Sequence, residues 1–270
     1  MDLRVEQGGW RGTAYVYTGG RPFMAARRTV VFIHGALHDH SVWTLLARWC
    51  AHHGHEVLAP DLPGHARSSG PALESVEALA DWLLGVVDAA GASECVLVGH
   101  SMGSLIALEA AARAPERVRG LVLLGAAAPM PVAEALLDTA RRDPLRAIDM
   151  VNVLSHSGIA SKPSFPGPGS WLPGASRALM RRVQAGYPAG NLFLADFEVC
   201  NGYTRGLEVA HGVDCPATLV VGSRDRMTAP RQSQALAQAL QARTVTVPAG
   251  HAMMSEAPDE VLAALRGALA

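Results

Sequence analysis

The stretch VLVGHSMGSLIALEAA, residues 96–111, decides the fold because its hydrophobic period changes in the middle. Its first half is a continuous apolar run of the kind that forms a buried strand, and its second half has the apolar spacing of a helix. Gly99, Ser101 and Gly103 lie at the junction. A serine that only capped the helix would not need a glycine two residues before it and another two residues after it. Ser101 therefore has two interpretations, a helix cap or a catalytic nucleophile.

Apolar runs and helical segments alternate along most of the chain. We expect buried strands at 29–35, 56–61, 95–100, 120–126, 217–225 and 243–251, and helices near 41–53, 73–89, 102–113, 230–241 and 258–269. The strand runs are continuous rather than alternating, which is typical of parallel strands covered on both faces. The first two dozen residues predict an antiparallel edge hairpin. The sequence thus predicts an α/β fold with a mostly parallel sheet flanked by helices.

The alternation stops between Pro129 and about Gly206. Three pieces there have helical spacing, PVAEALLDTARR, PLRAIDMVNVL and ASRALMRRVQ, and they are separated by a Pro/Gly-rich segment, SKPSFPGPGSWLPG. An insertion of this length between two strand–helix units is a lid or a small second domain. We expect a core of residues 1–128 and 207–270, and a helical cap of residues 129–206 over the carboxyl edge of the sheet.

Composition narrows the partners and the compartment. The chain has 270 residues, 49% of them hydrophobic, and 23 Lys+Arg against 24 Asp+Glu, so no basic surplus predicts binding to nucleic acid or to an acidic membrane. The charged start MDLRVEQGGW and the lack of a long apolar run predict a soluble, cytoplasmic protein without a signal peptide. The four cysteines lack C-x-x-C spacing, which predicts reduced thiols rather than a zinc site. We expect a small-molecule substrate and a monomer or homodimer.

The strand–serine–helix context meets the structural condition for a nucleophile elbow. The two glycines let the strand and the helix approach closely, and the serine hydroxyl is presented at the positive end of the helix. Serine needs a base at neutral pH. His251 follows the last predicted strand and Asp225 ends the strand before it, so both emerge at the same edge as Ser101. The alternatives are a solvent-exposed loop for His251, and an Asx-turn or an ion pair with Arg224 or Arg226 for Asp225.

A tetrahedral oxyanion needs backbone N–H donors that are fixed in advance. Met102 supplies one at the start of the helix, and Ala36 is the best candidate for the other, because Gly35 lets the chain turn inward after the strand that ends at 35. The alternative is an ordinary strand-to-helix loop in which Gly35 only marks the end of the strand.

Five blocks of the chain resemble, in order, the signature blocks of the α/β-hydrolase superfamily: HGALHDHSVW (34–43), DLPGHARSSG (61–70), GHSMGS (99–104), VVGSRDRM (220–227) and PAGHAMMSEAP (248–258). The chain is most similar to small esterases, cofactor-free haloperoxidase-like perhydrolases and carbon–carbon bond hydrolases. The resemblance implies a mechanism carried by Ser101, His251 and Asp225, a helical cap and no cofactor. Ala66 and Ser104 stand where the family usually has glycine.

Other signals are weaker. His38, Asp39 and His40 follow His34 in a pattern that faintly resembles a zinc-hydrolase loop, but no later cluster completes it and we expect no metal. Lys162 is expected to be a solvated loop lysine. The alternative, which a resemblance to plant cyanohydrin lyases of this fold would imply, is that Lys162 stabilises an anionic leaving group.

The sequence predicts a serine hydrolase of the carboxylesterase class that acts on a small to medium ester or a similar acyl bond. The pocket residues that we expect, favouring an apolar acyl or aromatic group, are His38, Met130, Phe165, Trp171 and Phe193. The alternatives are a carbon–carbon bond hydrolase or a perhydrolase on the same three residues, and a ligand-binding receptor-like protein that retains the fold. The acyl group, the leaving group and the oligomeric state do not follow from the sequence.

Overall fold

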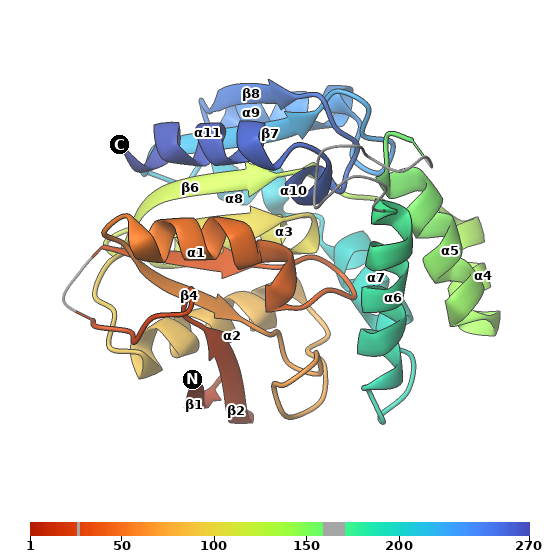
Figure 1. Ribbon diagram of the computed structural model, residues 1–270, viewed down its shortest axis with the longest axis horizontal. Helices are drawn as coiled ribbons and strands as arrows, with labels where there is room; N and C mark the ends of the chain where they lie inside the picture. Colours follow the sequence, from red (N-terminus) through yellow and green to blue (C-terminus); the bar gives the residue numbers. More distant parts are fainter. Residues whose placement is uncertain (26–27, 159–170) are drawn as a thin grey trace.

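The computed structural model of the chain describes residues 1–25, 28–158 and 171–270. In these residues, eight strands form one sheet (Figure 1): β1 (Asp2–Gln7), β2 (Trp10–Tyr17), β3 (Thr29–Ile33), β4 (Glu56–Pro60), β5 (Cys95–His100), β6 (Val118–Leu124), β7 (Ala217–Gly222) and β8 (Arg243–Val247). The helices of the core are η1 (His40–Trp43), α1 (Thr44–His52), α2 (Val76–Ala89), α3 (Met102–Arg113), α8 (Gly206–Ala210), η2 (Pro230–Ser233), α9 (Gln234–Ala239), α10 (Met253–Glu256) and α11 (Pro258–Leu269). The remaining helices are α4 (Glu134–Arg142), α5 (Pro144–Ser155), α6 (Leu172–Ala185) and α7 (Leu192–Gly202).

The strand order is β1-β2-β4-β3-β5-β6-β7-β8. Strands β3 to β8 run parallel, whereas β1 and β2 form an antiparallel hairpin at one edge, as the sequence predicted. Ile33 pairs with Gly99, and His100 pairs with Leu124, so the carboxyl ends of β3, β5 and β6 lie level with one another. The loops that follow these strands therefore meet at one edge of the sheet, which is where open parallel sheets bind ligands.

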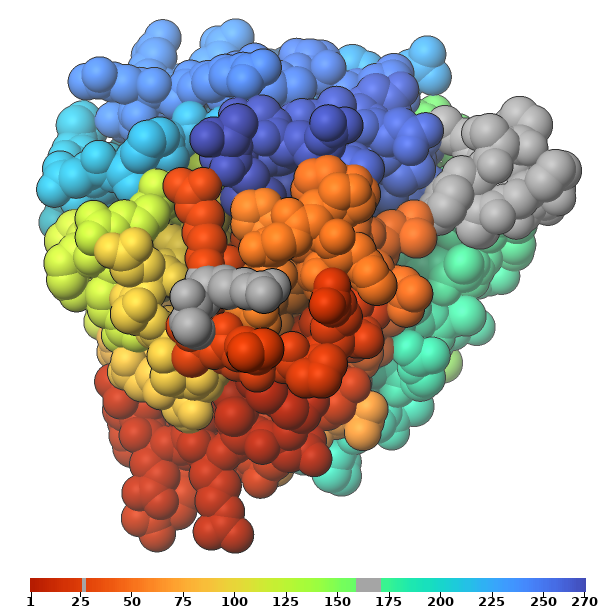
Figure 2. All heavy atoms as spheres, turned by 60° about the vertical axis from the view of Figure 1, so that its left-hand side comes forward, coloured from red at the N-terminus to blue at the C-terminus, as the bar shows by residue number. Residues whose placement is uncertain are grey.

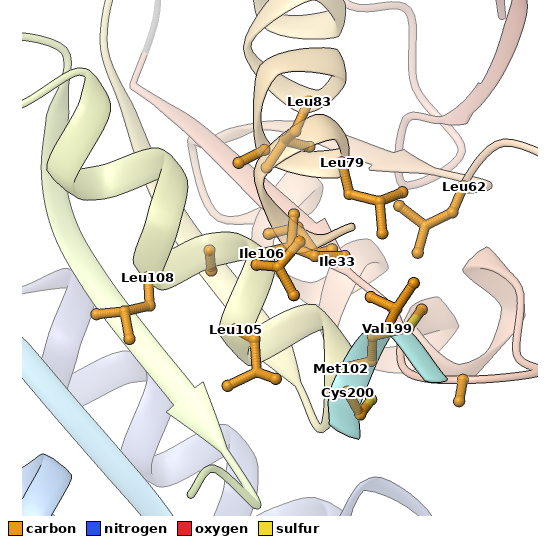
Figure 3. Close-up of a cluster of buried hydrophobic side chains, with 14 of the residues drawn as sticks. Ile33, Leu62, Leu79, Leu83, Met102, Leu105, Ile106, Leu108, Val199 and Cys200 are labelled. Carbon is orange, nitrogen blue, oxygen red and sulfur yellow. The ribbon is translucent and has the colours of Figure 1, made fainter. Parts of the chain in front are cut away.

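The central strands β3 to β7 are buried on both faces, which explains their continuous apolar runs. The edge strand β8, which the sequence predicted to be buried, is exposed along most of its length, because no further strand covers that side. Along β3, Val30 and Phe32 face α1 and α11, while Val31 and Ile33 face α2 and α3. Figure 2 shows α1 and α11 as adjoining parts of one surface of the molecule. Figure 3 shows the opposite face, where Ile33 lies among side chains of α2 and α3. Because successive side chains of a strand point to opposite faces, a strand covered on both faces is apolar along most of its length.

Helices α4, α5, α6 and α7, hereafter the insertion helices, lie beyond the carboxyl ends of the strands (Figure 1). Helices α4, α5 and α6 correspond to the three helical pieces that the sequence predicted. Helix α7 was not predicted. It packs against α3 of the core and against α4 and α5. No helix in the described part of the chain combines the length and the apolar character that a membrane span requires.

Candidate active site

Ser101 occupies a sharp turn between β5 and α3, with φ 53° and ψ −122°. A residue with a side chain rarely adopts a positive φ, and such strain concentrates at functional sites. The serine side chain makes no capping hydrogen bond to α3, so the helix-cap interpretation is wrong. The turn is held instead through its backbone, because the Ser101 N–H donates to the Leu124 carbonyl at 2.9 Å.

The two glycines that flank Ser101 are required by close backbone contacts. A Cβ on Gly99 would lie 2.2 Å from the carbonyl oxygen of Gly103, and a Cβ on Gly103 would lie 2.2 Å from the carbonyl oxygen of Ile33. Both distances are far below van der Waals contact, and the atoms they involve belong to the backbone, which cannot move aside. Helix α3 therefore packs this closely against β5 only with glycine at position 99, and against the end of β3 only with glycine at position 103.

Asp225 and His251 form a buried pair at the same edge of the sheet. His251 Nδ1 lies 2.8 Å from Asp225 Oδ2, and the Thr228 hydroxyl donates to the same oxygen at 2.9 Å. The other carboxylate oxygen accepts the backbone N–H groups of Met227 and Thr228 at 2.8 and 2.9 Å. Asp225 is thus both the Asx-turn that the sequence allowed and the partner of a histidine. Arg226 donates to backbone carbonyls of Val153 and His156 rather than to Asp225.

The electrostatics of this pair favour an ionised carboxylate. Burial by itself would raise the pKa of Asp225, but the His251 ring and the hydrogen bonds from Thr228 outweigh it, so the pKa lies below its ordinary value. Because Nδ1 of His251 faces this carboxylate, Nε2 is the nitrogen left for another partner.

A glycine and a second imidazole ring lie next to the His251 ring. A Cβ on Gly125, which follows β6, would lie 3.0 Å from two atoms of the ring, so glycine makes room for it. His100 packs on the other side with ring centroids 4.7 Å apart, and its Nε2 donates to the His251 carbonyl at 2.9 Å. No hydrogen bond joins the Ser101 hydroxyl to His251 or to any other described residue.

The backbone after β3 turns directly against Ser101. A Cβ on Gly35 would lie 3.1 Å from the Ser101 Cβ. His38 N–H donates to the Gly35 carbonyl at 3.2 Å and closes a β-turn. Within the described residues, neither the Ala36 N–H nor the Met102 N–H donates to a protein acceptor. Two unpaired donors therefore flank the candidate nucleophile.

The histidines of the 34–40 segment have separate partners. His34 Nε2 accepts the Leu62 N–H at 3.0 Å, His40 Nδ1 pairs with Asp61 at 2.8 Å, and His38 Nδ1 donates to the Ala36 carbonyl at 2.8 Å. Burial lowers the pKa of His38 to about 4, so its ring is neutral near pH 7. The segment is organised by hydrogen bonds within the protein.

A cavity of about 630 Å³ opens beside His38, His100 and His251, between α1, α6 and α10. Its other walls are mainly apolar, with Leu45, Leu46, Leu172, Leu179, Met180 and Met254 among the lining residues. Arg182 stands at its edge and pairs with Asp39 at 2.9 Å.

The structure brings only part of the predicted pocket together. Of the five residues expected there, His38 lines this cavity. Phe193 is fully buried and stacks on Phe197 with centroids 4.3 Å apart, Met130 is buried in the core, and Trp171 is 48% exposed. Phe165 and Lys162 lie outside the described residues.

Sequence reasoning missed several residues of the site. Thr228 stands three residues after Asp225, and His100 belongs to the motif itself, so a search for polar neighbours of the three candidates would have found both. Asp39 and Arg182 gave no such signal, because their pairing depends on how α6 packs over the loop after β3.

Comparison with known proteins identifies the family and the fold of the chain. A family model described as alpha/beta hydrolase fold matches residues 28–258. The chain is 36% identical over 126 residues to lipase LipV of Mycobacterium tuberculosis, a match covering 46% of this chain and 41% of the lipase. It is 30% identical over 193 residues to RutD of Pseudomonas savastanoi, a protein provisionally named as a carbamate hydrolase. This match covers 69% of this chain and 71% of RutD.

Among solved structures, the esterase EaEST of Exiguobacterium antarcticum superposes with a TM-score of 0.82 at 16% identity, covering 99% of this chain and 98% of the esterase. At this low sequence identity, the similarity shows a shared fold and nothing more. The chain spans less than half the length of LipV, so the likeness to that lipase concerns a part of it. Since the family model spans most of the chain, and RutD is matched over two thirds of its length, the family is established: this chain belongs to the α/β-hydrolase fold family.

Proposed function

We propose that the protein is a serine hydrolase that cleaves a small to medium carboxylic ester, or a similar acyl bond, through an acyl-enzyme on Ser101. The observation that carries the proposal is the 2.8 Å pair of His251 and Asp225 at the sheet edge where Ser101 sits in a strained turn. A base held by a buried acid beside such a serine is the arrangement that nucleophilic acyl transfer requires.

In the first step, the Ser101 Oγ–H bond breaks and its proton goes to His251 Nε2, while Oγ forms a bond to the substrate carbonyl carbon. The carbonyl electron pair moves to the oxygen. When the tetrahedral intermediate collapses, the bond to the leaving group breaks and His251 returns the proton to it. Water then repeats the sequence, and the acid product and free Ser101 result. Asp225 stays ionised and stabilises the imidazolium.

No hydrogen bond joins the Ser101 hydroxyl to His251 among the described residues, and the proposed mechanism needs this contact only in the substrate complex. Hydroxyl–imidazole contacts are often long in free enzymes and tighten in the substrate complex. His251 is held from two sides, by Asp225 at Nδ1 and by His100 at its carbonyl.

The N–H groups of Ala36 and Met102 are proposed as the oxyanion donors. Both lack a protein acceptor among the described residues, and Met102 begins α3, so the partial positive charge of that helix end favours the oxyanion. Preorganised donors of this kind each contribute about 10²- to 10³-fold to the rate.

The cavity supports an apolar substrate, because mainly aliphatic side chains line it and burial keeps the pKa values of His38 and His100 below their ordinary value. We propose that residues 129–206 act as a cap. Helix α6 supplies one wall of the cavity, so a change in the cap would change the substrate preference without touching Ser101.

A fluorophosphonate probe followed by peptide mass spectrometry tests the function. A covalent adduct is expected on Ser101, and a series of p-nitrophenyl esters of increasing chain length should be turned over. Esters hydrolysed without labelling of Ser101 would contradict the mechanism. Labelling without ester turnover, but with cleavage of a carbon–carbon bond or with peracid formation, would assign the alternative reactions. Ligand binding without labelling or turnover would favour a receptor-like protein.

A further inference from the structure

One carboxylate of the insertion helices reaches into the core and touches the loop beside Ser101. Asp196, on α7, is 4% exposed. Its Oδ2 accepts the Leu37 N–H at 2.8 Å and lies 2.9 Å from His65 Nε2. Leu37 follows β3 and His65 follows β4, so a single oxygen atom joins three segments that are up to 159 residues apart.

The partner of Asp196 is a cation. His65 Nδ1 lies 3.1 Å from the Pro63 carbonyl and Nε2 faces Asp196, so both ring nitrogens act as donors, which requires the imidazolium. Burial would lower the pKa of His65, but the charge of Asp196 and these hydrogen bonds outweigh it, so the pKa lies above its ordinary value. The Leu37 N–H therefore donates to an ionised acceptor, and charge-assisted hydrogen bonds are roughly twice as strong as neutral ones.

The Leu37 N–H belongs to the peptide on which the geometry of the turn depends. In the β-turn from Gly35 to His38, Leu37 has φ 52°, a position that type II turns normally give to glycine. The Ala36–Leu37 peptide is held at both ends, because its carbonyl accepts from His38 Nδ1 and its N–H donates to Asp196. Rotation of this peptide would bring Leu37 to negative φ and relieve the strain. Asp196 opposes that rotation.

We propose that Asp196 is a positioning residue of the oxyanion site. By holding the Ala36–Leu37 peptide, it keeps the neighbouring Ala36 N–H directed at the oxygen of an acyl group on Ser101. The inference rests on the proposed function, and adds that an insertion helix controls the transition-state donor. The roles proposed for Ser101, His251 and Asp225 stay the same. Only the orientation of one oxyanion donor, the Ala36 N–H, depends on α7.

The test compares an oxygen ester with its thionoester. Sulfur is a weak hydrogen-bond acceptor, so a thionoester gains little from the oxyanion donors, and the ratio of the two kcat values measures their contribution. For Asp196→Ala we expect kcat for the oxygen ester to fall roughly ten- to hundredfold with little change in KM. The thionoester rate should fall much less, so the ratio contracts.

Glu109→Gln is the matched control. Glu109 is a buried carboxylate that accepts from Tyr203, next to the end of the same helix α7, at 2.6 Å, and it pairs with Arg113 at 2.8 Å. Removing its charge perturbs a buried polar contact between α3 and the end of α7, far from the turn. The ratio of oxygen ester to thionoester should stay at the wild-type value in this variant.

If Asp196→Ala does not fold, the double variant Asp196→Asn with His65→Gln removes both charges and leaves no uncompensated buried ion. The same contraction of the ratio is expected, because a neutral acceptor holds the Leu37 N–H less firmly. A folded variant that keeps the wild-type ratio, either because neither rate falls or because both rates fall equally, would overturn the positioning role. The hydrolase proposal would remain intact. If wild-type protein is neither labelled at Ser101 nor active on esters, both proposals fail together.

Discussion

Asp225 binds His251 with one carboxylate oxygen and the backbone of the turn that follows it with the other. Oδ2 lies 2.8 Å from His251 Nδ1, and Oδ1 accepts the N–H groups of residues 227 and 228. The carboxylate is therefore fixed in orientation before it meets the imidazole, and the imidazole is in turn fixed by a group that cannot rotate. This relationship makes the effect of removing the charge predictable.

Asp225→Asn should lower kcat for ester hydrolysis by about 10⁴-fold with little change in KM. The amide retains the shape of the side chain, but it favours the wrong imidazole tautomer and cannot stabilise the imidazolium. Steady-state kinetics on a p-nitrophenyl ester measure the effect. Near-normal kcat in Asp225→Asn, combined with a large loss in Asp61→Asn, would mean that another acid serves His251.

Ser101→Ala should abolish ester turnover, with a loss of about 10³-fold or more, while the circular dichroism spectrum stays unchanged. Alanine meets the same backbone strain at φ 53° as serine, so the turn survives and only the nucleophile is lost. Ser75→Ala is the control, since Ser75 caps α2 through its hydroxyl and should affect stability rather than turnover. More than a tenth of wild-type activity in a folded Ser101→Ala protein would contradict the assignment.

Gly99→Ala should prevent folding or destabilise the protein by about 3 kcal/mol or more, because the new Cβ overlaps backbone atoms at 2.2 Å. Gly202→Ala is the matched control on a helix, since a Cβ there meets nothing within 4 Å. That variant should be stabilised by roughly 0.4–1 kcal/mol. Urea denaturation measures both changes, and equal stabilities for the two variants would argue against the close approach of β5 and α3.

The buried neutral histidines should make stability fall as the pH is lowered from about 6.5. Burial holds the pKa of His100 well below its ordinary value, with the neighbouring His251 and His38 acting in the same direction. In this window the unfolded chain binds a proton that the folded protein excludes, so protonation favours unfolding. The loss continues until the pH reaches the folded-state pKa, which for His38 is about 4.

His100→Gln isolates one such group, since glutamine can still donate to the His251 carbonyl but does not titrate. The dependence of the unfolding free energy on pH between 5 and 6.5 should become shallower by up to about 1.4 kcal/mol per pH unit. Urea denaturation at several pH values measures it. An unchanged slope would indicate that the His100 ring takes up protons to the same extent in the folded and the unfolded protein.

The sequence alone predicted the parallel sheet, the edge hairpin and the turn at Ser101, because these depend on local pattern. Continuous apolar runs indicate burial on both faces, and Gly99 indicates a close backbone approach between β5 and α3, which are adjacent in the chain. It also placed Ser101, Asp225 and His251 at one edge, since parallel strands end together. Helix α7 escaped prediction because it is buried between α3 and the other insertion helices, so its apolar residues do not follow one face.

Only the tertiary structure decided which polar groups meet across long stretches of chain. Asp196 reaches Leu37 and His65, and His100 reaches the carbonyl of His251. Phe193, an aromatic residue expected in the pocket, is packed on Phe197 instead, while the cavity is walled by aliphatic residues of α1 and α6. Period and spacing specify how a segment folds and which face it buries. The partner of a side chain depends on the packing of elements distant in sequence, which no local pattern encodes.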